Sequence, residues 1–167
     1  MRRQKGFSLI ELLIVVAIIL IIAAIAIPNL QRAKMSANEA SAVAGMRTIF
    51  TAEAAYYAQG WSNPGALGFS GTLPDLGNSA GCNPPSLTSA CQLDNVMANA
   101  ITPATAKAGY YFTYNPISNG TLNVGFTLNG DPATRGSTGQ RSFYTDQSGI
   151  VRANPAAAAG PNDVPLQ

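Results

Sequence analysis

The sequence contains no histidine, few charged residues and only two cysteines. The absence of histidine excludes a Ser-His-Asp triad and a histidine metal cluster, and two cysteines without histidine give no plausible zinc site. No phosphate-binding glycine loop is present. An enzyme would have to rely on acids that show no paired spacing, namely Asp75, Asp94, Asp131 and Asp146. We therefore predict neither catalysis nor a cofactor.

Positive charge is concentrated at the N-terminus. Arg2, Arg3 and Lys5 are three of the ten basic residues, which leaves seven cations against eight acids in the rest of the chain. This balance does not support a basic surface for nucleic acid, so no sequence-specific nucleic-acid binding is predicted. Charged residues make up only 11% of the chain, which fits a subunit largely covered by copies of itself.

A long apolar run follows the basic start. No residue from Leu12 to Ile27 is polar or charged, and residues 7–10 extend the run to the roughly 20 residues that span a bilayer as a helix. Basic residues before the run predict a cytoplasmic N-terminus. Glu11 stands alone in this run, at a cost of roughly 2.5–3.5 kcal/mol on insertion scales. No partner for it is visible nearby in the sequence.

Cleavage after Gly6 would supply that partner. It would remove the basic leader and free the α-amine of Phe7. The amine lies about one turn from Glu11 in its own chain, but a neighbouring copy shifted along the helix axis presents its amine more directly. Burying two opposite charges together is tolerable where burying one is not. We therefore interpret Glu11 as a register device for stacking identical helices, as buried polar residues are in coiled coils.

These residues resemble the class III signal of type IV prepilins and type II secretion pseudopilins. The match covers about the first 30 residues and consists of Lys5-Gly6-Phe7-Ser8-Leu9-Ile10-Glu11-Leu12-Leu13-Ile14-Val15, with Pro28 closing the apolar part. The resemblance implies a leader at residues 1–6 and cleavage between Gly6 and Phe7 by a prepilin peptidase, which also methylates the Phe7 amine. It further implies subunit docking through Glu11 and Phe7, and a helix kink at Pro28.

Two other interpretations of the N-terminus remain open. An ordinary secretory signal ends in a small-residue cleavage site, and Ala24-Ile25-Ala26 provides one. Against it stand the length of the core and the acid inside it. An uncut membrane anchor would leave Glu11 unpaired. A mature chain beginning at residue 27 would contradict the pilin interpretation.

Beyond the membrane or filament-core segment (residues 7–28), the chain becomes amphipathic over residues 29–58. This half continues the same helix, because one set of residues forms an apolar stripe. The stripe consists of Met35, Ala42, Val43, Met46, Ile49, Phe50, Ala54, Tyr56 and Tyr57. The other faces carry Arg32, Lys34, Asn38, Glu39, Arg47 and Thr51.

The globular head is predicted over residues 59–167. A loop rich in Gly, Pro, Ser and Asn fills about residues 60–93, and Cys82 and Cys91 should form a disulfide within it if the head is exported. Two reduced cysteines are the alternative and would require a cytosolic head. Asp94 caps a short helix over residues 94–100.

The alternation of residue types predicts four strands, at residues 110–115, 121–129, 142–146 and 150–152. Turn signals lie at residues 118–120 and 146–149. The apolar face of the second strand, with Leu122, Val124, Phe126 and Leu128, should pack on the helical stripe. The tail from Ala153 is expected to be loosely attached.

These elements give an α+β fold, in which the C-terminal half of a long, kinked N-terminal helix packs on a small antiparallel four-stranded sheet at about residues 109–153. The pilin resemblance implies the same fold. Pilins of this kind commonly pair cysteines near the C-terminus, and this chain departs from that pattern. Some pseudopilins hold calcium in a C-terminal loop; Asp131 and Asp146 are weak candidates, and turn formation is the simpler role for both.

The sequence therefore predicts a structural subunit that is held in the inner membrane as a single-pass precursor, with its head in the periplasm. An assembly platform in the inner membrane would draw it into a helical homopolymer. The first function is a type IV pilus subunit for adhesion, motility or DNA uptake. The alternative is a major pseudopilin that acts as a piston in type II secretion.

Overall fold

The computed structural model describes residues 7–60, 67–78 and 82–166. The leader and the Gly6 side of the predicted cleavage site lie outside them. The chain divides into two units, Met1–Lys34 and Met35–Gln167. Helix α1 (Leu9–Gln59) contributes its first part to one unit and its second part to the other.

Helix α1 is continuous through Pro28, although proline supplies no N–H to the helical ladder. It ends at Gln59, where Gly60 adopts a positive φ of 66°, the left-handed conformation that commonly follows a helix. The long helix of the sequence prediction is confirmed, and the kink at Pro28 stays a prediction. The helix is long and apolar enough to cross a membrane, a property that signal sequences share.

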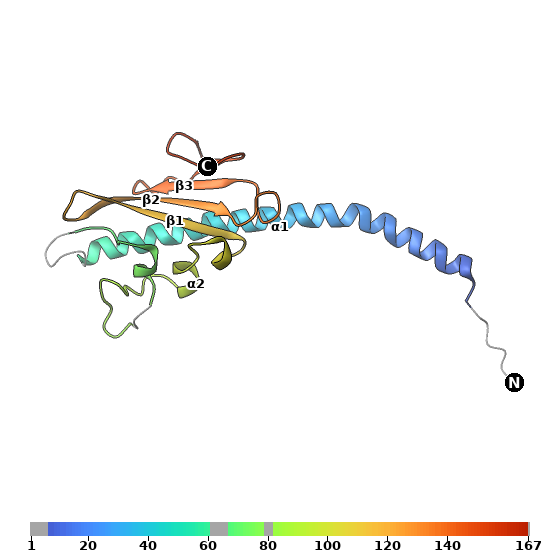
Figure 1. Cartoon of the computed structure of the whole chain (residues 1–167), viewed down its shortest axis with the longest axis horizontal. Coiled ribbons are helices and arrows are strands. Elements are labelled where there is room, and N and C mark those ends of the chain that lie inside the picture. Colours follow the sequence, from blue (N-terminus) through green and yellow to red (C-terminus); the bar gives the residue numbers. More distant parts are fainter. Residues whose placement is uncertain (1–6, 61–66, 79–81, 167) are drawn as a thin grey trace. The chain divides into compact units, whose positions relative to one another are not determined.

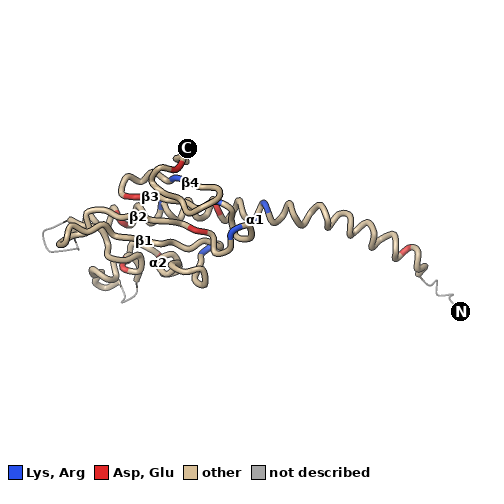
Figure 2. The backbone as a smooth tube through the Cα atoms, turned by 45° about the horizontal axis from the view of Figure 1, so that its top comes forward, with Lys and Arg blue, Asp and Glu red and all other residues tan. Residues whose placement is uncertain are grey.

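The first part of α1 leaves its apolar surface uncovered. Large apolar side chains from Phe7 to Leu30 are between 46% and 80% exposed in the single chain. In Figure 2 this stretch is free of charge between the acid near its start and the first basic residues. Burying apolar surface is the main favourable term in association. We therefore expect this surface to be covered by lipid or by other apolar helices.

The sheet is antiparallel, and its five strands follow chain order, β1-β2-β3-β4-β5. These strands are β1 (Tyr110–Ser118), β2 (Asn123–Pro132), β3 (Ser142–Asp146), β4 (Arg152–Asn154) and β5 (Val164–Pro165). Figure 1 shows β1, β2 and β3 along the second part of α1. The predicted α+β fold is confirmed, with five strands in place of four.

The core lies between the second part of α1 and one face of the sheet. Met46 and Ile49 of α1 are fully buried together with Phe112, Phe126, Leu128 and Phe143 from the first three strands. A Cβ on Gly130 would lie 3.3 Å from both Met46 Sδ and the Phe112 ring, so helix and sheet meet closely there. Val124 was predicted on this face but is 51% exposed, because the buried alternation of β2 begins only at Gly125 and Phe126.

The segment between α1 and β1 is more ordered than a loop. It contains η1 (Leu73–Leu76), α2 (Asn95–Ala98) and η2 (Pro103–Thr105). Leu73 and Leu76 are buried, and Asp94 caps α2 by accepting a hydrogen bond from the Met97 N–H at 3.0 Å, as the sequence predicted. The glycine- and proline-rich composition had favoured a loop here, and it gave no indication that Leu73 and Leu76 are buried.

The C-terminal tail is attached to the sheet, so the prediction of a loose tail was wrong. Strand β5 pairs with β4, and Ala159 is buried. Asp163 holds the turn before β5, because its carboxylate accepts hydrogen bonds from Gly160 N–H at 2.8 Å and Asn154 Nδ2 at 3.0 Å. Arg152 donates to the Asp163 carbonyl at 3.0 Å. Polar contacts of Asp163 with residues 3, 9 and 11 positions earlier in the chain thus order a segment whose local composition favours disorder.

Candidate assembly site

The start of α1 gives Glu11 a local partner. Helix α1 begins at Leu9, so Ser8 occupies the N-cap position and Glu11 the third helical position. The Ser8 N–H donates to Glu11 Oε2 at 2.9 Å, which is the glutamate half of a capping box. A negative side chain in the first turn also interacts favourably with the helix dipole. The sequence suggested no nearby partner for this acid, and the capping geometry corrects that view.

One hydrogen bond does not satisfy a carboxylate, which offers about four acceptor sites. Within the described residues, Ser8 is the hydrogen-bond donor found for Glu11, and both Glu11 and Phe7 are exposed. The carboxylate therefore keeps accepting capacity beside an apolar helix surface. It is suited to bind a cation presented by another molecule.

At the start of the second unit, Glu39 fastens the β2–β3 loop to α1. Its carboxylate accepts hydrogen bonds from the N–H groups of Gln140 and Arg141, at 2.9 and 3.1 Å, and from Arg141 Nε at 2.8 Å. The neighbouring Asn38 donates to the Thr138 carbonyl at 2.8 Å. Burial alone would raise the pKa of Glu39, but the two N–H groups and the guanidinium outweigh it and lower the pKa.

A second glutamate, Glu53, is fully buried farther along α1. It accepts hydrogen bonds from both the N–H and the hydroxyl of Ser70, and the Tyr114 hydroxyl donates to the Ser70 carbonyl at 3.1 Å. Burial raises the pKa of Glu53 more than these donors lower it. The same burial, with the negative charge of Glu53, raises the pKa of Tyr114.

Neither glutamate was identified from the sequence as a structural residue, and Glu39 was wrongly placed on a face other than the apolar stripe. The signal was present, however. The buried positions Glu39, Ala42, Met46, Ile49, Glu53 and Tyr56 alternate in steps of three and four, the spacing of one helix face. Both glutamates therefore lie on the stripe that packs against the head.

Comparison with known proteins identifies the N-terminus. Residues 1–27 match the prokaryotic N-terminal methylation motif. The chain is 33% identical over 93 residues, 56% of its length, to the type IV major pilin protein PilA of Myxococcus xanthus. It is 64% identical over 39 residues, 23% of its length, to the type IV wide pilus major component PilA4 of Thermus thermophilus.

The chain thus carries the N-terminal methylation motif and is similar over part of its length to type IV pilins. The matches span 42% and 30% of these two relatives, less than half of either. No solved structure matches the chain. The similarity therefore covers only part of each relative.

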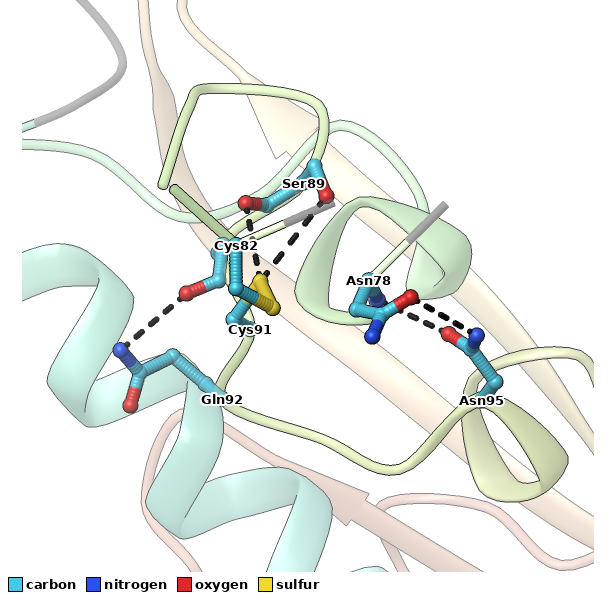
Figure 3. The surroundings of a disulfide bond; sticks show 7 residues. Asn78, Cys82, Ser89, Cys91, Gln92 and Asn95 are labelled. Atoms are coloured by element: carbon cyan, nitrogen blue, oxygen red, sulfur yellow. Dashed lines mark hydrogen bonds between the residues drawn. A yellow bond between two sulfur atoms is a disulfide. The ribbon is translucent and has the colours of Figure 1, made fainter. Parts of the chain in front are cut away.

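Cys82 and Cys91 form the predicted disulfide, with their Cα atoms 5.8 Å apart. The chain at the second cysteine is held against η1 and the residue after it, because Ala90 N–H donates to the Asp75 carbonyl at 2.8 Å and Cys91 N–H to the Gly77 carbonyl at 2.9 Å. Figure 3 shows Asn78 and Asn95 exchanging hydrogen bonds close to the bridge. The disulfide thus fixes a region that already carries backbone pairing.

The structure does not bring Asp131 and Asp146 together. Asp146 lies opposite Thr127 in the sheet, four residues from Asp131 along β2, which corresponds to about 13 Å. Asp131 accepts a hydrogen bond from the Ser142 hydroxyl at 2.6 Å, and Asp146 accepts one from Ser148 N–H at 2.8 Å within a turn. Asp146 therefore has the turn role that the sequence predicted, whereas Asp131 lies inside β2 rather than in a turn. The two contacts do not indicate a shared calcium site.

Proposed function

We propose that this chain is the structural subunit of a type IV pilus. The observation that carries the proposal is the uncovered apolar surface of the first part of α1, interrupted by one carboxylate that retains accepting capacity. A helical homopolymer buries such surfaces against one another. The pilus components among the relatives favour this function over a pseudopilin of type II secretion, which is the alternative.

In this proposal a prepilin peptidase cuts between Gly6 and Phe7 and methylates the Phe7 amine. The precursor waits in the inner membrane with its head in the periplasm, and an assembly platform moves it into the filament. The amine of one copy then pairs with Glu11 of the next. The Ser8 N–H occupies only one oxygen of Glu11, so docking can add an ion pair between subunits to the local hydrogen bond.

The experiment that tests this function is electron microscopy of material sheared from the cell surface, with mass spectrometry of the fibre protein. Fibres made of this chain, beginning at a methylated Phe7, are the expected result. Deletion that stops the export of an enzyme, with no surface fibres in the parent cells, would indicate the pseudopilin. A mature protein beginning at residue 27 would overturn both assignments.

A further inference from the structure

We propose that Asn119 is a site of spontaneous covalent modification, at which its side-chain amide is lost and an acid forms. Asn119 and Gly120 lie in the turn between β1 and β2, and residues 119–121 are exposed. In an Asn-Gly pair the glycine N–H can attack the asparagine side chain, because no Cβ shields the nitrogen. A Cβ on Gly120 would meet no atom within 4 Å, so the surroundings also leave the approach open.

The turn activates the side-chain carbonyl that is attacked. Asn119 Oδ1 accepts hydrogen bonds from Thr121 N–H at 3.1 Å and from Leu122 N–H at 2.9 Å. Two fixed donors on one carbonyl oxygen stabilise the negative charge that develops there when a nucleophile adds, as in an oxyanion hole. The same bonds hold the Asn119 side chain over the turn.

The attacking nitrogen is accessible as well. The Gly120 N–H donates to the exposed Ser118 hydroxyl at 3.1 Å and takes no part in the ladder of the sheet, because the register between β1 and β2 ends at Ser118 and Asn123. The proton that must leave therefore points to a side chain in contact with solvent, and water can remove it without breaking the sheet.

The reaction balances without an oxidant or reductant. The Gly120 nitrogen loses its proton and bonds to Asn119 Cγ, the bond from Cγ to Nδ2 breaks, and the amide nitrogen leaves as ammonia. A five-membered cyclic imide remains. Water then opens this ring at either of its carbonyl carbons, giving aspartate or its isomer in which the main chain runs through the side chain. Each modified head gains one negative charge at the tip of the β1–β2 hairpin.

The chain contains its own control, because Asn129 and Gly130 form a second Asn-Gly pair. This pair lies inside β2, where Gly130 is paired with Phe112 on one side and Phe143 on the other. Asn129 Nδ2 donates to the Ala159 carbonyl at 2.7 Å, and the space around Gly130 is filled by Met46 and Phe112. The folded structure should therefore prevent the same chemistry at this pair.

The test is peptide mapping of the full chain, purified in detergent and incubated at mildly alkaline pH, with a second sample kept in concentrated urea. In the folded sample we expect Asn119 to react faster than Asn129 by at least about tenfold, because a central strand reacts only after local opening. In urea the two rates should become similar. Incubation in heavy-oxygen water should label the product, and Asn119→Gln should remove the signal from that peptide.

Slower reaction of Asn119 in the folded chain than in urea would overturn the proposal, because it would mean that the hydrogen bonds to Oδ1 protect the side chain instead of activating it. Equal rates at Asn119 and Asn129 in the folded chain would also overturn it. The comparison uses the unaltered sequence, so it does not depend on whether any variant folds.

Discussion

The carboxylate of Glu53 receives two hydrogen bonds from one residue, Ser70, through its N–H and its hydroxyl. Glu53 lies on α1 and Ser70 on the segment that leads to η1, so this pair fastens the connecting segment to the helix. The glutamate has no exposed surface, and burial penalises its charged form. The contact therefore combines a specific attachment with a sensitivity to pH.

Glu53 should make the head less stable as the pH rises. Its pKa is raised above the ordinary value of 4.5, so the folded state binds a proton more tightly than the unfolded state does. This contribution is fully present below the ordinary pKa and is lost as the pH rises through the folded-state pKa. Glu53→Gln should remove that part of the pH dependence, because the neutral amide still accepts from Ser70. Thermal unfolding of the full chain in detergent at several pH values measures it.

Glu39 provides the matched control, because its pKa is lowered. A lowered carboxyl pKa gives stability that is present above the ordinary value and is lost as the pH falls through the folded-state value. The Glu39→Gln and Glu53→Gln variants should thus change the stability profile in opposite directions on the acid side. The same change from both variants would contradict the assigned directions.

Glu39→Ala tests the attachment itself. It would leave the partly exposed N–H groups of Gln140 and Arg141 without their acceptor, and losing a typical hydrogen bond costs about 0.5–1.5 kcal/mol. We expect a loss of stability of about that size, with the β2–β3 loop becoming more accessible to hydrogen exchange. Arg141→Gln removes the exposed partner alone and should cost less, because partly exposed ion pairs contribute about 1 kcal/mol or less.

The pattern of correct and missed predictions follows from the range of the interactions involved. Helix α1, the strands and the cap at Asp94 depend on local periodicity and capping, which the sequence shows directly. Glu39 and Glu53 were missed because charged side chains usually mark exposed faces. Their partners, Arg141 and Ser70, are supplied by other elements, and Ser70 is 17 residues away. The fixed tail was missed for another reason: Asp163 binds Gly160 and Asn154, only 3 and 9 residues away, in a turn that the alanine- and proline-rich composition does not indicate.

Replacing Asp163 by alanine should release the tail. The carboxylate is the acceptor for both Gly160 N–H and Asn154 Nδ2, and β5 is only two residues long, so its own pairing with β4 is short. We expect faster proteolysis and hydrogen exchange after residue 154, with little change in the core around Phe126. Protection of the tail equal to that of the unaltered chain would show that β5 pairing suffices.

The disulfide should contribute about 2–3 kcal/mol, the range expected for closing a loop of nine residues. The variant Cys82→Ser/Cys91→Ser measures it by equilibrium unfolding in detergent. Because Ala90 and Cys91 already pair with Asp75 and Gly77, part of the loop should stay ordered without the bond. An unchanged free energy of unfolding would mean that the backbone pairing alone fixes this region.

Glu11→Ala tests the docking role proposed for the assembly site. The variant loses the acceptor for Ser8 N–H, which costs α1 a capping interaction at its first turn, but the apolar run that holds the chain in a membrane is untouched. We expect a processed, membrane-held subunit and few or disordered filaments, scored by electron microscopy of sheared cells. Ser8→Ala is the matched control, because it keeps the backbone N–H and the acid, and it should assemble normally. Regular filaments from Glu11→Ala would show that apolar contact alone sets the register.

Gly6→Val should separately block cleavage, because it changes the residue before the assigned cut. Mass spectrometry of the purified chain measures this, and a mature mass in that variant would contradict the assigned site.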